Sequence, residues 1–286
     1  MSAERLSIAI INFNTRDDLL SCLAAARADA PLAEILVCDN GSRDGSIEAL
    51  RDRDVRLLAS RRNRGYAAAA NAALRRTDRE YLLLLNPDTT LRPGACDALL
   101  SFMDGHPEVG AAGPLLLDPD GSVQFSRRSF PDHRTAIAHR QSALTRWFPG
   151  NRLSRAYLRT DLAPDRPATV DWVSGAAILL RRTALDAAGP FDEGFFLYLE
   201  DVELCWRLQQ AGWRVAWVPD AAAVHRIGAS SRLVPRLALL ARHRSMWRWY
   251  ARHMRRSPLV DAATLIGLGM RLLWKTIHLC DRVRPP

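Results

Sequence analysis

The sequence contains almost no lysine, and its cysteines follow no pattern that would bind a metal or build a disulfide framework. Of the 40 basic residues only Lys275 is a lysine, so nearly all the positive charge comes from arginine. Five cysteines are scattered through the 286 residues, none at metal-ligand spacing: Cys22, Cys38, Cys96, Cys205 and Cys280. Five thiols cannot all pair, and this usage predicts a chain of a reducing, cytoplasmic compartment.

Several motifs that would define a class of function are also absent. The first residues, MSAERLSIAI, have no basic region followed by a long apolar run, so we expect no signal peptide. There is no G-x-G-x-x-G, no G-x-x-x-x-G-K-[ST] and no G-x-S-x-G. The chain therefore lacks the signatures of a Rossmann dinucleotide site, a P-loop and a hydrolase nucleophile elbow. It has no internal repeat and no low-complexity segment.

The net charge of +9 is concentrated at the C-terminal end of the chain. From Arg232 onward there are 12 of the 40 basic residues but only two of the 31 acidic ones, a local net charge of +10. The remainder therefore carries a net charge of −1. This distribution argues against a nucleic-acid-binding surface on the main domain, and we predict no nucleic-acid partner.

Short apolar runs alternate with segments of helical pattern in the first third of the chain. Such alternation predicts an α/β fold with a mainly parallel sheet covered on both faces. Ligands of such sheets bind beyond the carboxyl ends of the strands. The predicted strands occupy residues 6–13, 34–42, 55–60 and 81–85.

The helices between these strands carry recognisable start signals. Thr15 is placed to cap a helix that ends near Pro31, with Asp18 as the acid of a capping box. Ser46 is a candidate cap for a second helix, and an Ala-rich helix is expected within 63–77. Residues 126–168 show little periodicity, and we predict that they run around the mouth of the site.

The stretch YLLLLNPDTTL ends a buried strand at Asp88. Because Asn, Pro and Asp all favour turns, a turn acid is the simpler explanation of Asp88 taken alone. The alternative is a carboxylate that holds Mg²⁺ or Mn²⁺, which prefer oxygen ligands and share them with substrate phosphates. Asp39 follows its strand in the same way, either as a turn acid or as an acceptor for a nucleotide base or ribose. We expect the two aspartates at the ends of adjacent strands.

Acidic residues crowd the start of a later helix in LYLEDVELCWRLQQAG. Glu200, Asp201 and Glu203 could complement the helix dipole. Burial beside FFLYL would instead raise the pKa of a carboxyl there, which suits a general base. His225 ends a later strand, and it becomes a candidate metal ligand only if that strand returns beside Asp88.

The stretch NRGYAAAAN contains Gly65 and Asn71 among small residues. It predicts either a tightly packed helix or a close approach of the backbone to a bound nucleotide.

These pieces occur in one order along the chain: SIAIINFN, VCDNGSRDGS, NRGYAAAAN, LLLLNPDT, WVSGAAILLRR, GPFDEGFFLYLEDVELCWR and a late histidine. In this order the chain resembles glycosyltransferase family 2, inverting enzymes with the GT-A fold, and within it bacterial rhamnosyltransferases of polysaccharide assembly. The resemblance covers roughly residues 6–228.

The resemblance implies roles for individual residues. Asp39 would contact the base of the donor nucleotide. Asp88 would be the last acid of the family's D-x-D motif and bind Mg²⁺ or Mn²⁺, with Asn86 in place of the first acid. Asp201, paired with Glu200, would be the catalytic base. The other implied residues are His225 in the metal shell, Trp172 and Gly175 in the acceptor pocket, and Asn12, Asn14, Asn40, Gly65 and Asn71 in the nucleotide site.

The resemblance also implies a dTDP- or UDP-sugar donor and a glycan or lipid-linked glycan acceptor. Two other functions remain as alternatives: a nucleotidyltransferase of similar fold, and a non-catalytic nucleotide-sugar binding protein. The first would consume a nucleoside triphosphate and lack a late Glu-Asp base, and the second would show no turnover.

The C-terminal segment differs in character from the rest. We predict a glycosyltransferase domain over residues 1–231 and a basic helical tail over 232–286. The tail has no run of 18 apolar residues, so a spanning helix is not expected. Basic helices with aromatic and aliphatic side chains suit an anionic membrane surface, which favours a peripheral position at the inner face of the cell membrane. The alternative is a helical pair packed on the core or on a second subunit as a homodimer.

Overall fold

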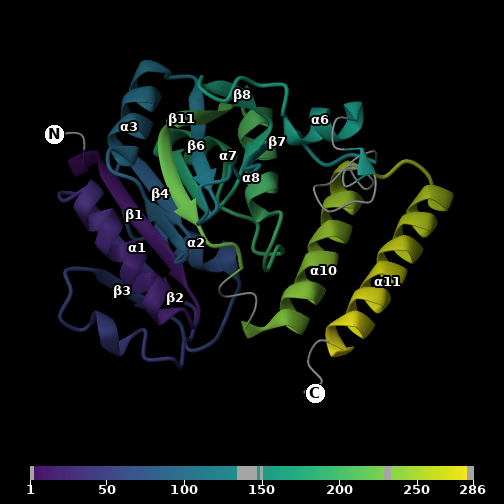
Figure 1. Cartoon of the computed structure of the whole chain (residues 1–286), viewed down its shortest axis with the longest axis horizontal. Coiled ribbons are helices and arrows are strands. Elements are labelled where there is room, and N and C mark those ends of the chain that lie inside the picture. The colour runs from purple at the N-terminus through teal and green to yellow at the C-terminus, as the bar shows by residue number, and fades with distance from the viewer. Residues whose placement is uncertain (1–2, 134–146, 149–150, 229–232, 282–286) are drawn as a thin grey trace.

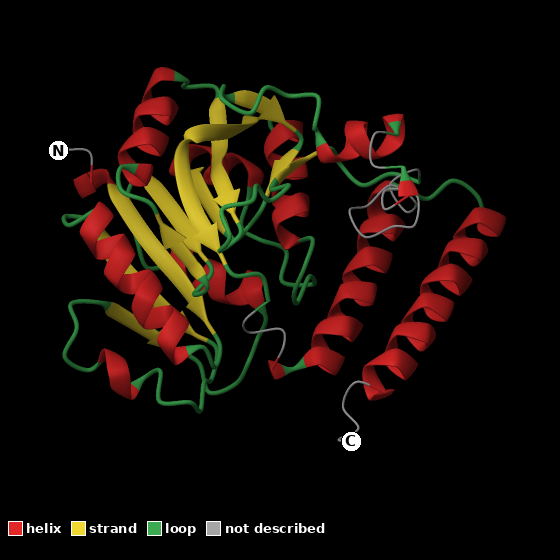
Figure 2. Ribbon diagram, in the orientation of Figure 1, coloured by secondary structure: helices red, strands yellow, loops and turns green. Residues whose placement is uncertain are grey.

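The computed structural model describes residues 3–133, 147–148, 151–228 and 233–281. Within these ranges the chain folds around one twisted sheet with helices on both faces (Figures 1 and 2). The strand order is β3-β2-β1-β4-β10-β6-β11-β5, and β8 pairs with β11. The strands of this sheet are β1 (Leu6–Asn12), β2 (Glu34–Asp39), β3 (Arg56–Ala59), β4 (Tyr81–Leu85), β5 (Thr89–Leu91), β6 (Val109–Leu117), β8 (Ala168–Val170), β10 (Ala177–Arg181) and β11 (Arg214–His225).

The sheet is parallel in its first half and mixed in its second. β3, β2, β1 and β4 run parallel to one another, as the alternating pattern predicted. β10 is antiparallel to both β4 and β6, and β11 is parallel to β6 but antiparallel to β5 and β8. A second small sheet pairs β7 (Arg127–Arg128) with β9 (Trp172–Val173). The antiparallel strands return the chain to the edge where the parallel strands end.

Helices cover both faces of the sheet, as predicted. One face packs against α1 (Arg16–Asp29) and α3 (Ala95–Gly105), and the other packs against α2 (Tyr66–Leu74), α7 (Arg182–Ala188) and α8 (Glu200–Gln210). Every residue of β1 and β4 is buried, because strands covered on both faces need no polar side. A short helix, α6 (Arg152–Leu158), lies in the segment predicted to surround the mouth of the site.

Neither predicted cap residue makes the expected capping hydrogen bond, although Thr15 does occupy the N-cap position. Thr15 stands at the N-cap of α1, but its hydroxyl donates to Asn12 Oδ1 at 2.8 Å instead of accepting from the helix. A distant carboxylate replaces it, since Asp44 Oδ2 accepts the Arg16 N–H at 2.8 Å. Asp44 also accepts the Ser46 hydroxyl, and only a 3₁₀ turn, Glu48–Leu50, follows where a second helix was predicted. Polar groups near strand ends compete with local caps for the same partners.

The C-terminal segment forms two antiparallel helices beside the sheet, α10 (Pro235–His253) and α11 (Pro258–Asp281) (Figure 1). α10 packs on the core through Trp249 and Tyr250, which are buried. α11 leaves many of its large apolar side chains exposed. No helix in the described ranges is long and apolar enough to cross a membrane.

Candidate active site

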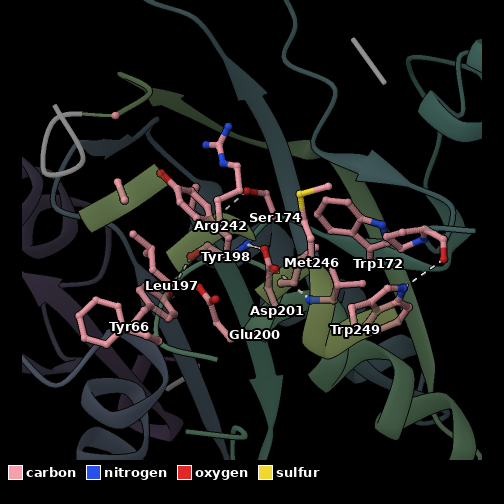
Figure 3. Close-up of a pocket in the computed structure, with 18 of the residues that line it drawn as sticks. Tyr66, Trp172, Ser174, Leu197, Tyr198, Glu200, Asp201, Arg242, Met246 and Trp249 are labelled. Atoms are coloured by element: carbon pink, nitrogen blue, oxygen red, sulfur yellow. Dashed lines mark hydrogen bonds between the residues drawn. The ribbon is translucent and has the colours of Figure 1, made fainter. Parts of the chain in front are cut away.

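A cavity of about 890 Å³ lies at the carboxyl ends of the parallel strands and continues to the C-terminal helices. Ten of the thirteen predicted site residues line it: Asn12, Asn40, Gly65, Asn86, Asp88, Trp172, Gly175, Glu200, Asp201 and His225. The structure thus brings residues from distant parts of the sequence to one site (Figure 3).

The loop that enters α8 has a strained backbone. Tyr198 and Leu199 adopt φ values of +70° and +66°, a left-handed conformation that costs a non-glycine residue about 1–3 kcal/mol. The start of α2 holds this loop, because the Tyr66 N–H donates to Phe196 O at 2.8 Å. Gly65 permits this contact, since a Cβ there would lie 2.4 Å from Phe196 O. The loop is therefore fixed where it presents the two carboxyls that begin α8.

Asp201 is held in one orientation by backbone hydrogen bonds. Its Oδ2 accepts the Gly175 N–H at 2.8 Å and its Oδ1 accepts the Val202 N–H at 2.9 Å. Burial raises the pKa of Asp201, while these two hydrogen bonds and the positive charge of Arg128 oppose that rise. The outcome is a carboxyl with an elevated pKa whose ionised form is nevertheless stabilised, which suits a general base.

Glu200 lies beside Asp201 in a different environment. Its side chain is buried, and its Oε2 has no hydrogen-bond partner among the described residues. Burial, and then the charge of Asp201, raise the pKa of Glu200 well above its ordinary value. When two neighbouring carboxyls differ in this way, the less solvated one keeps the proton. Glu200 therefore favours its protonated form more strongly than Asp201 does.

Asp88 and His225 meet in the lining of the same cavity. β11 does return beside Asp88, because it pairs with β5 in a register that places His225 opposite Thr89. His225 Nε2 lies 3.4 Å from Asp88 Oδ1. The sequence made His225 a candidate metal ligand only if its strand returned beside Asp88, and the structure meets that condition.

A glutamine fixes which nitrogen of His225 carries the proton. Gln124 Nε2 donates to His225 O at 2.7 Å and to Asp118 Oδ1 at 2.8 Å, so its Oε1 faces His225 Nδ1 at 3.0 Å. Nδ1 is then the hydrogen-bond donor, and Nε2 is the ring nitrogen that faces Asp88. Without a proton, Nε2 can bind a cation beside the Asp88 carboxylate, and such orientation of a histidine by an outer partner is common at metal sites.

Within the described residues no group of three or more His, Cys, Asp or Glu side chains could hold a metal ion. Asp88 and His225 form a pair rather than such a group, and their role as metal ligands stays a prediction. Mg²⁺ and Mn²⁺ sites often consist of one or two protein ligands completed by substrate phosphates and water.

Asp39 does not line the cavity. Its Oδ1 accepts the N–H groups of Gly41 and Ser42 at 3.0 and 2.8 Å, and its Oδ2 accepts Asn12 Nδ2 at 2.8 Å. The expectation that Asp39 and Asp88 end adjacent strands is wrong, because β1 lies between β2 and β4 and Asp88 falls in the turn after β4. The geometry around Asp39 is that of a turn acid, and its contact with a nucleotide base stays a prediction.

Asn14 and Asn71 also lie outside the cavity. Asn14 adopts a φ of +51°, and its Oδ1 accepts the Arg43 N–H at 2.7 Å. The Asn71 side chain exchanges two hydrogen bonds with the backbone of Phe191, each at 2.9 Å, and so ties α2 to the loop before α8. Their roles in nucleotide binding remain predictions.

Sequence reasoning missed three residues that shape the site. Gln124 orients His225, Tyr66 donates its hydroxyl to Gly175 O at 2.8 Å, and Arg128 stacks over the Trp172 ring at 5.2 Å. Arg128 lies within residues 126–168, which show little periodicity, and Gln124 lies just before them. No sequence pattern distinguishes either residue there. The aromatic ring after Gly65 was a visible signal for Tyr66.

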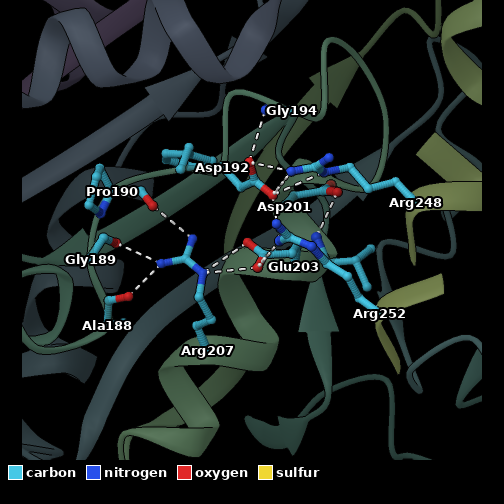
Figure 4. A network of polar contacts seen from close by, with 12 residues as sticks. Ala188, Gly189, Pro190, Asp192, Gly194, Asp201, Glu203, Arg207, Arg248 and Arg252 are labelled. Carbon is cyan, nitrogen blue, oxygen red and sulfur yellow. Dashed lines mark hydrogen bonds and ion pairs between the residues drawn. The ribbon is translucent and has the colours of Figure 1, made fainter. Parts of the chain in front are cut away.

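An ion-pair network ties α10 to α8 and to the loop before it (Figure 4). Arg248 pairs with Asp192 at 3.0 Å in the loop before α8, and Arg252 contacts both Asp192 and Glu203. Glu203 is also bound by Arg207 at 2.9 Å. Glu203 is therefore occupied in holding the helix in place, which accounts for one of the three acids at the start of α8.

Comparison with known proteins identifies the family. Residues 7–184 match the family model described as Glycosyl transferase family 2. The chain is 38% identical over 227 residues to N-acetylglucosaminyl-diphospho-decaprenol L-rhamnosyltransferase of Mycobacterium tuberculosis, covering 74% of this chain and 73% of that protein. It is 26% identical over 179 residues to Rhamnosyltransferase WbbL of Escherichia coli K12, covering 62% and 64%. The chain belongs to glycosyltransferase family 2.

Solved structures share the fold. The mannosyltransferase PcManGT of Pyrobaculum calidifontis, solved with GDP-Man and Mn²⁺, superposes with a TM-score of 0.57 at 16% identity, covering 99% of this chain and 76% of that one. GalNAc-T7, solved with UDP, GalNAc and Mn²⁺, gives a TM-score of 0.58 at 15% identity, covering 79% and 44%. The predicted GT-A fold and the predicted rhamnosyltransferase-like family are both confirmed, and the protein is a glycosyltransferase.

Proposed function

We propose that this glycosyltransferase moves L-rhamnose from dTDP-rhamnose to a lipid-linked glycan, with inversion at the anomeric carbon and Asp201 as the general base. The observation that carries the proposal is the Asp201 carboxyl, fixed by the N–H groups of Gly175 and Val202 in the cavity that also contains Asp88 and His225. The sugar and the acceptor are suggested by the relative from Mycobacterium tuberculosis, whose name states both.

The donor diphosphate would bind at the Asp88 side of the cavity. Asp88 and His225 would hold Mg²⁺ or Mn²⁺, which when bound neutralises charge on a departing diphosphate. Asn12, Asn40 and Asn86 line the same cavity and would supply amide groups for hydrogen bonds to the nucleotide. Gly65 completes this side, and Asp39, Asn14 and Asn71 would act from outside the cavity by holding its walls.

The acceptor hydroxyl would attack from the Asp201 side. Asp201 accepts the hydroxyl proton as the new bond forms between the acceptor oxygen and the anomeric carbon. The bond from that carbon to the diphosphate breaks, and its electron pair leaves with the nucleoside diphosphate. Attack on the face opposite the leaving group inverts the anomeric configuration. Trp172, which stacks with Arg128, forms an apolar wall on which an acceptor sugar ring can rest.

We also propose that α11 lies on the inner face of the cell membrane, which would place the enzyme in the cytoplasm as a peripheral protein. Its apolar side chains are exposed along the whole helix, at 52–84% for Leu259, Leu265, Ile266, Met270, Leu273, Trp274 and Ile277. Arginine and lysine on the same helix pair favour anionic lipid. Flotation of the full chain with phosphatidylglycerol vesicles tests this, and a stable homodimer in solution that does not float would contradict it.

Thermal unfolding with dTDP, UDP, GDP, ATP and NAD⁺, each with and without Mn²⁺, tests the donor site. A ligand at about 100 times its Kd stabilises the folded state by about 2.7 kcal/mol. We expect dTDP with Mn²⁺ to raise the Tm most. A preference for ATP would favour a nucleotidyltransferase, and diphosphate binding without any transfer to an acceptor would favour a non-catalytic binding protein.

A further inference from the structure

The active-site cavity extends past Asp201 into the space between α10 and α11. Each helix lines this extension with side chains three or four positions apart, which is one face of a helix. The lining residues are Leu237, Ala238, Arg242, Met246, Trp249 and Tyr250 of α10 and Thr264, Gly267, Leu268 and Arg271 of α11. The extension is thus a groove continuous with the catalytic base, and its walls are mainly apolar.

Two arginines from facing helices interrupt that apolar lining. The Arg242 guanidinium lies over the Tyr198 ring at 4.3 Å, and Arg271 Nη1 lies 3.3 Å from Met246 Sδ (Figure 3 labels Arg242, Tyr198 and Met246). Neither arginine forms an ion pair with a carboxylate in the described part of the chain. Arg271 is half-buried, and its pKa is lowered by burial and by the charge of Arg242.

Other arginines of the C-terminal segment do bind carboxylates. Arg248 and Arg252 of α10 bind Asp192, and Arg255, between the two helices, binds Asp261. The groove is also positive in a wider sense. Burial lowers the pKa of His243, and the charges of Arg271, Arg242 and Lys275 lower it further. A cationic pair next to apolar walls, left without protein anions, is suited to an anion attached to an apolar chain.

A glycine provides room for such a chain. A Cβ placed on Gly267 would have no heavy atom within 4 Å, so the groove is open beside it. Glycine inside a helix costs about 0.5–1 kcal/mol relative to alanine, so its position here is not explained by helix stability.

We infer that Arg242 and Arg271 bind the phosphate groups of a polyprenyl-diphosphate-linked acceptor, whose isoprenoid chain lies between α10 and α11 beside Gly267. This inference rests on the proposed function. Two guanidinium groups can each bind a phosphate group in bidentate fashion. The sugar attached to the diphosphate then extends along the cavity toward Asp201, and the chain leaves the groove beside the exposed apolar face of α11.

Binding of farnesyl diphosphate to the full chain, in the presence of saturating dTDP and Mn²⁺, tests the inference without requiring turnover. The dTDP blocks the donor site, so the probe reports only on the second site. Farnesyl diphosphate should bind at least about tenfold more tightly than farnesol, because charge-assisted hydrogen bonds are the strong ones. Arg242→Ala and Arg271→Ala should each weaken it about tenfold or more. Arg244→Ala is the matched control, since Arg244 is exposed on α10 outside the cavity, and should change binding less than twofold.

A second variant tests the chain-binding part. Gly267→Leu should fill the groove and abolish farnesyl diphosphate binding, while the Tm stays level or rises because leucine favours the helix. Unchanged binding in this variant, or in both arginine variants, would overturn the inference. The inference would also be overturned if the arginine variants lost affinity for phosphatidylglycerol vesicles as strongly as for farnesyl diphosphate. Arg242 and Arg271 would then bind the headgroups of bulk lipid.

The two proposals fail separately. A normal Tm shift with dTDP and Mn²⁺ beside absent farnesyl diphosphate binding would refute the acceptor groove alone. If dTDP did not bind, the proposed donor site would be refuted. Titration with farnesyl diphosphate in the absence of dTDP would still test the acceptor groove.

Discussion

Replacing the Asp201 carboxylate by an amide tests the assigned base, and the structure gives the size of the effect. The carboxylate accepts the Gly175 N–H through Oδ2 and the Val202 N–H through Oδ1. In Asp201→Asn only one oxygen remains, so in either orientation one of these N–H groups faces an NH₂ donor. An unsatisfied buried N–H costs about 1–3 kcal/mol, so we expect the Tm to fall by a few degrees and the fold to persist.

The loss of activity should be far larger than the loss of stability. A positioned general base contributes about 10²–10⁴-fold to the rate, which corresponds to about 3–5 kcal/mol of activation free energy. We expect kcat to fall by that factor while the Kd for dTDP stays within about threefold, because Asp201 lies on the acceptor side of the cavity. The assay is transfer from dTDP-rhamnose to a lipid-linked acceptor, with dTDP binding measured separately.

Asp220→Asn is the matched control, since Asp220 is exposed on β11 and outside the cavity. It carries the same chemical change and should leave kcat within about twofold, as surface substitutions usually have small effects. An Asp201→Asn enzyme that keeps more than a tenth of the parent kcat would refute the role of Asp201. A variant that loses dTDP binding but keeps its turnover would refute the placement of donor and acceptor.

The remaining predictions concern proton and metal binding. Burial raises the pKa of Asp201, so kcat should rise with pH, with an apparent pKa above that of an ordinary aspartate. A kcat that stays constant down to the ordinary aspartate pKa would contradict the elevated pKa. The pKa of Glu200 is raised in the folded state, so the parent protein should lose stability as pH rises from the unfolded pKa toward the folded one. Glu200→Gln should remove that loss, and unchanged Tm-against-pH curves for parent and variant would contradict a protonated Glu200. Gln124→Leu releases Nδ1 of His225 and should weaken Mn²⁺ binding in the dTDP complex about 10–100-fold, whereas equal Mn²⁺ affinity by titration calorimetry would argue against His225 as a ligand.

The first half of the fold follows closely from the sequence. The four parallel strands and the helices α1 and α2 were predicted within a few residues, because the apolar runs are bounded by turn residues. The helix predicted to begin at Ser46 was wrong, since only the 3₁₀ turn Glu48–Leu50 forms there. The capping hydrogen bonds were not predicted either, since Asp44 caps α1 from a different loop. The antiparallel strands β10 and β5 were also missed, because strand direction depends on contacts between distant segments rather than on local periodicity.

The site was predictable where residues follow strand ends or begin a helix. Asp88, Glu200 and Asp201 were identified in this way, and the meeting of Asp88 with His225 was stated as a condition that the structure meets. A turn acid was one of the two interpretations of Asp39, but the sequence could not decide between them, because the hydrogen bonds of a carboxylate depend on the path of the next four residues. Gln124 gave no signal, since its function exists only through its contact with the distant His225.

The anomeric configuration of the product tests the central claim most directly. The full chain would be incubated with dTDP-rhamnose, Mn²⁺ and a lipid-linked glycan acceptor, and the new linkage would be assigned by NMR from its one-bond carbon–proton coupling. Direct attack by a hydroxyl activated at Asp201 predicts a single product whose configuration is opposite to that of the donor. A product that retains the configuration of the donor, or hydrolysis of the donor without any transfer, would contradict the account.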